Sequence, residues 1–244
     1  MKKYVLVMDS GIGGASILKE IRNLLPNRNY IYFADTKNSP YGNKSKNEIL
    51  EIVYHNVLRF SKKYEIEALV LACNTASCVC SRFLRQTFPF PIVCVEPPIK
   101  VAVNAGYKNI LVLATAQTLK SNELLHNYLA NPNLNIKKIF PQNLATLIDN
   151  DPENLFLVEN ILENALNNKN YDVVVLGCTH YHFVKNQIEK ISGKPVITCE
   201  KQVANYVKAK LEKTGIDNAK PVLKIATSKK NLKMTKFLNI YLNF

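Results

Sequence analysis

Short apolar runs alternate with longer amphipathic segments along the whole chain, and this alternation restricts the fold more than any other feature of the sequence. It is the signature of repeated βα units, in which each strand is followed by a helix that covers the sheet. We predict strands at residues 4–8, 30–34, 68–72, 91–94, 109–114, 136–140, 173–177, 195–198 and 222–226. We predict helices in the gaps, for example at residues 14–25, 45–64, 76–87, 152–168 and 203–213. The fold class is therefore α/β with mainly parallel sheets.

Two of the predicted strands end in nearly the same way. Residues 69–75 are Leu-Val-Leu-Ala-Cys-Asn-Thr, and residues 174–179 are Val-Val-Leu-Gly-Cys-Thr. Each is an apolar, β-branched run that delivers a thiol to the carboxyl end of a buried strand. Because open α/β folds bind their ligands at that edge of the sheet, we expect Cys73 and Cys178 to belong to one site.

The chain also has an internal echo that suggests two similar lobes. Residues 4–10 resemble residues 109–115, and each stretch opens a half that later carries one of the cysteine segments. Glu96, Pro97 and Pro98 make a plausible crossing point, because consecutive prolines interrupt both helix and sheet. The pattern alone does not assign the last strand and helix to either lobe.

Composition restricts the class of protein. The chain has 244 residues, 47% of them hydrophobic, which is enough for a sizeable core. Its longest apolar runs last only a few residues, far short of the roughly 20 that a membrane-spanning helix needs. The apolar stretch after Lys2 and Lys3 stops at Asp9, which is too short for a signal peptide. We therefore expect a cytoplasmic protein without a membrane segment.

The formal net charge of +13 suggests a nucleic-acid-binding protein as a rival hypothesis. Residues 201–244 contain ten lysines against two acidic residues, but no arginine and no RNA- or DNA-binding motif. Lysine and asparagine are abundant throughout the chain, so we interpret the excess as a solvated surface. A basic surface would also attract an anionic metabolite.

The six cysteines do not indicate a disulfide framework, since no secretory signal accompanies them. Cys73, Cys78 and Cys80 lie close together, but without a matching second half or a nearby histidine they predict no zinc site. We interpret Cys78, Cys80, Cys94 and Cys199 as small buried apolar residues. The sequence therefore predicts neither a metal nor a cofactor.

Polar residues gather at the predicted strand ends. Asp9 begins a glycine-rich turn, residues 9–14 (Asp-Ser-Gly-Ile-Gly-Gly), which lacks the spacing of a nucleotide-binding loop. A turn at residues 39–42 (Ser-Pro-Tyr-Gly) would offer backbone donors and a tyrosine hydroxyl. Both cysteines precede a predicted helix start, where thiols ionise below the free pKa of about 8.5, so we predict two activated thiols. His180, two residues after Cys178, is a candidate base or orienting group.

Two reactions use such a set. Disulfide oxidoreduction normally uses Cys-x-x-Cys, whereas these cysteines are about a hundred residues apart. Inversion of a stereocentre needs one base to remove the α-hydrogen from one face and one acid to return a proton on the other. A thiol and a thiolate on opposing lobes suit that geometry, and matched proton affinities let them exchange roles.

Four motifs in register resemble those of the bacterial glutamate racemases: residues 9–14, 40–42 (Pro-Tyr-Gly), 72–76 (Ala-Cys-Asn-Thr-Ala) and 177–181 (Gly-Cys-Thr-His-Tyr). The similarity of order and spacing covers almost the whole chain. Relatives that racemise aspartate share the cysteine pair but typically carry glutamate where this chain has His180, which favours glutamate. The resemblance implies a cofactor-independent isomerase that interconverts L- and D-glutamate and supplies the D-isomer for peptidoglycan and cell-wall synthesis.

The resemblance also implies two pseudosymmetric α/β lobes, each a mainly parallel sheet flanked by helices, with the active site between them. The first lobe comprises residues 1–95 plus 203–244, and the second comprises residues 96–202. Cys73 would be the base toward D-glutamate and Cys178 the base toward L-glutamate, with Asp9 and His180 supporting the nearer cysteine. The implied substrate-binding residues are Asp9, Ser10, Tyr41, Gly42, Asn74, Thr75, Thr179 and His180, with Thr115 and Thr118 as further candidates.

Three residues depart from the family pattern. His182 stands where the last motif usually continues with proline, and we expect it to alter a helix start rather than the chemistry. Pro97 replaces the glutamate of an Ile-Glu-Pro turn, and Asp149 replaces a glutamate that lines the site in many relatives. None of the three is one of the four implied catalytic residues.

Other functions stay open at this point. An aspartate racemase or another two-cysteine racemase, such as a hydantoin racemase, is the enzymatic alternative. A basic nucleic-acid-interacting protein is the non-enzymatic one. Glutamate is the expected small-molecule partner, and the sequence leaves a homodimer open.

Overall fold

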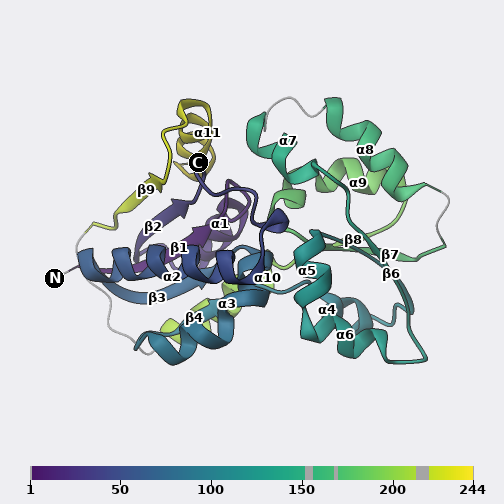
Figure 1. Cartoon of the computed structure of the whole chain (residues 1–244), viewed down its shortest axis with the longest axis horizontal. Helices are drawn as coiled ribbons and strands as arrows, with labels where there is room; N and C mark the ends of the chain where they lie inside the picture. The colour runs from purple at the N-terminus through teal and green to yellow at the C-terminus, as the bar shows by residue number, and fades with distance from the viewer. Residues whose placement is uncertain (1, 152–155, 168–169, 213–219, 244) are drawn as a thin grey trace.

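The computed structural model describes residues 2–151, 156–167, 170–212 and 220–243, which form two parallel sheets flanked by helices (Figure 1). The first sheet has the strand order β4-β3-β1-β2-β9 and the second β6-β5-β7-β8. The paired strands are all parallel. Their bounds are β1 Lys3–Asp9, β2 Asn29–Ala34, β3 Glu65–Leu71, β4 Ile92–Cys94, β5 Asn109–Ala114, β6 Asn135–Ile139, β7 Val173–Gly177, β8 Val196–Ile197 and β9 Leu223–Thr227. The α/β class is confirmed.

Strand β1 shows why these apolar runs do not alternate with polar residues. Val5 and Val7 belong to one buried cluster, while Leu6 and Met8 belong to another on the opposite face. Because successive side chains of a strand point to opposite faces, both faces of the sheet are buried. A parallel sheet that is covered on both sides needs continuous apolar strands.

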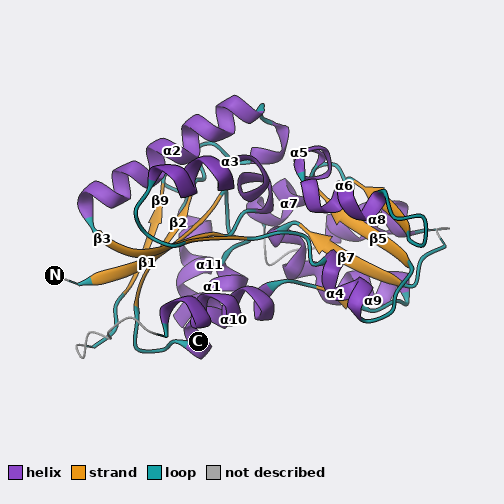
Figure 2. Cartoon of the chain, turned by 90° about the horizontal axis from the view of Figure 1, so that it is seen from below, coloured by secondary structure: helices purple, strands orange, loops and turns teal. Residues whose placement is uncertain are grey.

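Helices cover the two faces of the first sheet (Figure 2). Three of them, α1 (Ala15–Leu24), α10 (Glu200–Leu211) and α11 (Leu232–Asn243), share the buried cluster of Val5. On the opposite face, α2 (Lys46–Lys63) and α3 (Asn74–Thr87) share the cluster of Leu6. Helix α2 begins with a capping box, in which Ser45 and Glu48 exchange side-chain and backbone hydrogen bonds.

The second sheet is covered in the same way. Buried residues of α4 (Ile99–Asn104) and α6 (Glu123–Leu129) pack with Val112 and Val175 on one face. Buried residues of α7 (Leu144–Asn150), α8 (Phe156–Leu166) and α9 (Lys185–Ser192) pack with Leu111 and Leu176 on the other. The remaining short elements are α5 (Ala116–Ser121) and the 3₁₀ helices η1 (Tyr41–Asn43) and η2 (Thr179–Val184).

The chain passes between the sheets twice. Strand β4 in the first sheet is followed by α4 beside the second, so residues 95–98 form the first connection, as predicted. After β8 in the second sheet, α10 packs against α1 of the first. Strand β9 then pairs with β2, an assignment that the alternation left open and the resemblance implied.

The predicted strands at residues 109–114 and 173–177 coincide with β5 and β7, and the other strands differ at their ends by at most three residues. Of the predicted helix at residues 152–168, the positions 152–155 and 168 lie outside the described residues, as does position 213 of another predicted helix. In the described ranges, no helix has both the length and the apolarity that crossing a membrane requires.

Candidate active site

The carboxyl ends of β3 and β7 each lead into a cysteine that precedes a helix. Cys73 is the N-cap residue of α3, and Cys178 is the N-cap residue of η2. Both are buried, with exposed fractions of 6% and 5%. Ser10, whose hydroxyl lies 3.8 Å from the sulfur of Cys73, directly follows Asp9, and Asp9 accepts a hydrogen bond from Thr179, the residue after Cys178. The structure therefore brings both predicted thiols into one site.

Glycines allow the loops at the two sheet edges to approach closely. A Cβ atom on Gly13 would lie 2.3 Å from Thr179 Oγ1, and one on Gly42 would lie 2.9 Å from the Cβ of Thr115. Such distances are well below van der Waals contact, so a side chain at either position would push the two edges apart. The glycine-rich turn thus serves close approach between the lobes, and the loop at residues 39–42 does the same.

Asp9 lies at the end of β1 and is fully buried. Its Oδ1 accepts a hydrogen bond from the backbone N–H of Gly11 at 2.8 Å, and its Oδ2 accepts one from Thr179 Oγ1 at 3.0 Å. Burial raises the pKa of Asp9 above the usual value, although the positive charge of His180 and these two hydrogen bonds oppose the change. Asp9 therefore links the two lobes, and the protonation of its carboxyl group depends on burial, on His180 and on these two hydrogen bonds.

Cys73 faces groups that disfavour its ionisation. Ser10 Oγ lies 3.8 Å from its sulfur, and the structure places Asp9 close enough to repel a thiolate. Burial, followed by the charge of Asp9, raises the pKa of Cys73 to about 12, despite a hydrogen bond from the backbone N–H of Ala76 at the start of α3. The prediction of an activated thiol is therefore wrong for Cys73, because desolvation and a nearby carboxylate outweigh the helix N-terminus.

Cys178 faces an imidazole. His180 Nδ1 lies 3.8 Å from the sulfur, and His180 Nε2 lies 2.9 Å from Asp149 Oδ1. Burial disfavours a charged imidazole, but the negative charge of Asp149 and the hydrogen bond to it raise the pKa of His180 well above the ordinary value. The same ion pair lowers the pKa of Asp149 against the effect of burial. An imidazolium therefore lies beside the second thiol.

The sequence predicts Asp149 as the replacement of a glutamate that lines the site in many relatives, but it does not predict the pairing of Asp149 with His180. Besides His180, it accepts hydrogen bonds from the backbone N–H of Ile12 at 3.0 Å and from Ser39 Oγ at 3.0 Å. It comes from α7, the helix that follows the carboxyl end of β6. A carboxylate after a strand of the second sheet is the signal that could have identified it. Asp149 joins loops of the first lobe to the histidine of the second.

A third contact between the lobes consists of hydroxyl groups. Thr75 Oγ1 lies 2.9 Å from Thr115 Oγ1 and 3.2 Å from Thr118 Oγ1.

Next to Thr75, Asn74 is only 2% exposed, and neither the nitrogen nor the oxygen of its side-chain amide has a hydrogen-bond partner. Buried polar groups in proteins are nearly always paired, so this amide indicates a place where a polar ligand would bind.

The other predicted binding residues lie in the same region. Ser10 and Thr179 are buried beside Cys73 and Asp9, respectively. Tyr41 is also buried, but its hydroxyl donates to Asp35 Oδ2 at 2.6 Å. The proton of this hydroxyl is therefore donated to a buried carboxylate.

The arrangement suits proton transfer. Two buried sulfur atoms come from opposite lobes, one beside a carboxyl group and the other beside an imidazolium. A compact substrate between them would present one face to each sulfur. One group could then accept a proton while the other donates one, which is general acid–base catalysis with two exchangeable partners.

Comparison with protein families identifies one match. The model of the Asp/Glu/hydantoin racemase family matches residues 5–216, which include both cysteines, Asp9, Asp149 and His180.

Individual proteins agree with this match. The chain is 36% identical over 250 residues to a glutamate racemase of Halothermothrix orenii, covering 96% of this chain and 97% of the relative. A crystal structure of glutamate racemase from Francisella tularensis in complex with D-glutamate superposes with a TM-score of 0.86 at 26% identity, covering 100% of this chain and 94% of the other. The Escherichia coli glutamate racemase, in complex with L-glutamate and the activator UDP-MurNAc-Ala, gives a TM-score of 0.84 at 31% identity, covering 99% and 96%.

Proposed function

The chain belongs to the Asp/Glu/hydantoin racemase family, and from that premise we propose that it interconverts L- and D-glutamate without a cofactor. In a bacterium the D-isomer would supply peptidoglycan synthesis. The relatives named above are glutamate racemases, and two of them bind D- and L-glutamate.

One observation supports the proposal: two buried cysteines, after β3 of the first sheet and after β7 of the second, are joined by contacts through Ser10, Asp9 and Thr179. A single thiol would explain nucleophilic or redox chemistry equally well. Two thiols that face each other across a substrate explain inversion at a carbon atom, because the proton must leave from one face and arrive at the other.

In the proposed reaction, the thiolate of one cysteine removes the α-hydrogen of glutamate and becomes a thiol. The electron pair of the broken C–H bond stays on the substrate as a carbanion conjugated with the carboxylate. The thiol of the other cysteine then donates its proton to the opposite face and becomes a thiolate. The product has the opposite configuration, and the protonation states of the two sulfur atoms have exchanged.

The environments of the two cysteines support different starting states. We propose that the imidazolium of His180 stabilises a thiolate on Cys178, while Asp9 keeps Cys73 protonated before substrate binds. Because a charge on one sulfur opposes ionisation of the other, only one thiolate forms at a time. Following the resemblance, Cys178 acts as the base toward L-glutamate and Cys73 as the base toward D-glutamate.

Polar side chains around the thiols would hold the substrate. The unpaired amide of Asn74 is the best supported of them, since it has a donor and an acceptor without partners. The hydroxyls of Ser10, Thr75 and Thr179 are buried in the same region. From the loop at residues 39–42, the backbone of Tyr41 and Gly42 would contribute rather than the tyrosine hydroxyl.

Substrate entry requires movement, since the two cysteines are nearly inaccessible. We propose that residues 1–95 plus 203–244 and residues 96–202 are the two lobes that separate, with the two connections between the sheets as hinges. Opening would break the contacts of Asp149 with Ser39 and of Thr75 with Thr115. Closure around glutamate would then exclude water from the reacting carbon.

The test is the loss of circular dichroism from L-glutamate and, separately, from D-glutamate, in deuterated water without pyridoxal phosphate. We expect both isomers to lose their signal and to gain deuterium at Cα. The same assay with L-aspartate separates the main alternative, and turnover of aspartate without turnover of glutamate would overturn the choice of substrate. Absence of any racemisation would leave the basic nucleic-acid-binding hypothesis, which predicts an affinity that decreases steeply with salt.

A further inference from the structure

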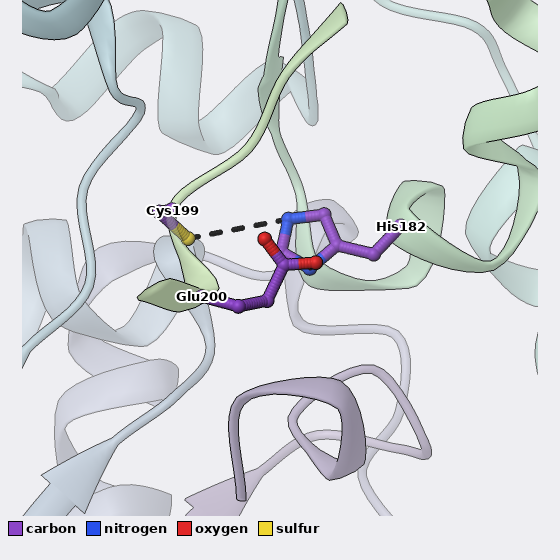
Figure 3. Close-up of side chains that lie close together, drawn as sticks. All are labelled: His182, Cys199 and Glu200. Carbon is purple, nitrogen blue, oxygen red and sulfur yellow. Dashed lines mark hydrogen bonds and ion pairs between the residues drawn. The ribbon is translucent and has the colours of Figure 1, made fainter. Parts of the chain in front are cut away.

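A second cluster of reactive side chains lies close to the two-cysteine site but takes no part in the proposed reaction. It contains His182 from η2, Cys199 at the N-cap of α10, and Glu200 from the first turn of α10 (Figure 3). One nitrogen, sulfur or oxygen atom of each residue lies within 4.8 Å of the other two. Within the described ranges, no other group of histidine, cysteine and acidic side chains is as compact.

The hydrogen bonds of His182 determine which ring nitrogen is available. His182 Nδ1 lies 2.9 Å from Glu200 Oε1 and 3.0 Å from Ser16 Oγ. The hydroxyl of Ser16 donates to the backbone carbonyl of Gly13 at 3.0 Å, so its oxygen accepts from the ring. With the proton of a neutral imidazole on Nδ1, the lone pair of Nε2 points to the sulfur of Cys199, 4.0 Å away.

From this geometry we propose that His182 Nε2, Cys199 Sγ and the Glu200 carboxylate form a binding site for a divalent transition-metal ion such as Zn²⁺. Nitrogen, thiolate and carboxylate are the donors that zinc prefers, and a water molecule would complete a tetrahedral site. This proposal is independent of the racemase function.

The nitrogen–sulfur distance needs only a small adjustment. Tetrahedral zinc with bonds of about 2.3 Å to sulfur and about 2.0 Å to nitrogen keeps those two atoms about 3.5 Å apart. The observed separation of 4.0 Å is therefore about half an ångström too long, which a rotation of the Cys199 side chain can correct. Binding would replace the thiol proton by the metal and release that proton to solvent.

Ser16 explains how Glu200 can change partner. The single proton on His182 Nδ1 has two acceptors, so one of them is dispensable. If the carboxylate of Glu200 turns to the metal, Ser16 still accepts the proton on Nδ1 and keeps Nε2 unprotonated. Partners of this kind, which orient a metal-binding histidine, typically change metal affinity 10- to 100-fold when removed.

Of the three side chains, the carboxylate of Glu200 is the one that lies toward solvent. Glu200 and Ser16 line a hollow at the surface together with Thr198 and Lys201. The side chains of His182 and Glu200 are 2% and 16% exposed, so the carboxylate marks the outer side and the ring the inner side of the site. A metal would tie η2, which also carries His180, to the first turn of α10.

The probe is Co²⁺, because a cobalt–thiolate bond gives a charge-transfer absorption band that identifies a cysteine ligand. The active-site thiols must be removed first, so the starting protein is the full-length chain with Cys73→Ser and Cys178→Ser. We expect a band that saturates at one equivalent of Co²⁺. Addition of Cys199→Ser should abolish it, and addition of Ser16→Ala should weaken cobalt binding by 10- to 100-fold.

Cys94→Ser is the matched control, since Cys94 is also a thiol but belongs to β4 and is not one of the three clustered residues. It should leave the band unchanged. A band that survives Cys199→Ser, or no band at one equivalent of Co²⁺, would overturn the proposal.

A second measurement covers the case in which a variant folds poorly. Far-ultraviolet circular dichroism checks that each variant is folded. Thermal unfolding is then recorded without Zn²⁺ and with one equivalent of Zn²⁺ per protein chain. Zn²⁺ should raise the unfolding temperature of the starting protein and of Cys94→Ser but not that of His182→Ala, because binding to the native state stabilises it. An equal rise in His182→Ala would contradict the site.

Discussion

The two halves of the active site have the same backbone plan and opposite electrostatics. In each half, a buried parallel strand ends in a cysteine at the start of a helix. Cys73 lies near the carboxyl group of Asp9, whereas Cys178 lies 3.8 Å from the imidazole of His180. Two thiols at equivalent strand ends thus have different charged neighbours, Asp9 at the end of β1 and His180 in η2.

The carboxylates that act on the two thiols, Asp9 and Asp149, also contact the opposite lobe. Asp9 of the first lobe accepts from Thr179, and Asp149 of the second lobe accepts from Ile12 and Ser39. The groups that distinguish the two thiols are therefore also groups that connect the two sheets. The following changes test how far the two halves differ.

Replacement of either cysteine should have the largest effect. Cys73→Ser and Cys178→Ser should each lower kcat for racemisation by about 10²- to 10⁴-fold, which is the usual effect of losing a general acid or base. Each variant should still catalyse elimination from a β-substituted substrate of one configuration, because one base remains. Cys94→Ser is the control and should retain full activity. Loss of elimination from both configurations in one variant would instead indicate a structural cysteine.

Removal of the Asp149 charge should weaken only the Cys178 half. Asp149→Asn should lower kcat by about 10²-fold near pH 8, because burial then favours a neutral His180. The loss should be smaller near pH 6, where the imidazole is protonated more readily. Asp149→Glu keeps the charge and should retain most of the activity. A loss that is equal at both pH values would mean that Asp149 acts by shape rather than by charge.

The same ion pair should also contribute to folding stability in a defined pH window. Asp149 has a lowered pKa, so its contribution is present above the unfolded value of about 3.9 and is lost as the pH falls through the folded one. His180 has a raised pKa, so its contribution is complete below about 6.5 and is lost as the pH rises through the folded value. Urea unfolding of the wild type and Asp149→Asn should therefore differ most between about pH 4 and 6.5, by about 3–5 kcal/mol. A difference that does not vary with pH would contradict this account.

Asp9→Asn changes the other half. It removes the negative charge that opposes ionisation of Cys73, so the pKa of Cys73 should decrease from about 12. Thiol titration by ultraviolet absorbance, in a Cys178→Ser background, measures this change. Asp172→Asn is the matched control and should not alter the titration. It removes a carboxylate that binds Asn109 at the start of β5, whereas the site lies at the carboxyl ends of the strands. An unchanged titration in Asp9→Asn would mean that burial alone sets the pKa of Cys73.

Much of the fold followed from the sequence, for a physical reason. Runs such as residues 110–114 and 173–177 are apolar without interruption, and only a strand that is buried on both faces requires that pattern. The positions of Cys73 and Cys178 followed in turn, since the carboxyl end of a parallel strand is a predictable place. The sequence pattern did not predict which sheet β9 joins, because that pairing depends on tertiary packing and not on local periodicity.

The electrostatics of the site were less predictable. Proximity to a helix N-terminus is visible in the sequence, but the burial and the carboxylate that raise the pKa of Cys73 are not. The pairing of His180 with Asp149 joins residues 31 positions apart through two different elements. Likewise, the carboxylate of Asp35 that binds the Tyr41 hydroxyl is an ordinary loop residue in the sequence. Contacts of this kind depend on the tertiary arrangement.

We expect the smallest effect from changes in the cluster of threonine hydroxyls that joins the lobes. These changes distinguish a role in substrate binding from a role in closing the lobes. Thr75→Val and Thr118→Val each remove a hydroxyl from the contact of Thr75 with Thr118, at 3.2 Å, while nearly keeping the side-chain volume. Either change should cost about 1 kcal/mol of stability, since it removes hydrogen bonds within a buried cluster. If Thr75 also holds glutamate, Thr75→Val alone should raise KM several-fold, whereas Thr118→Val should leave KM close to that of the wild type. Equal increases in KM would show that the cluster acts on binding only through closure of the lobes.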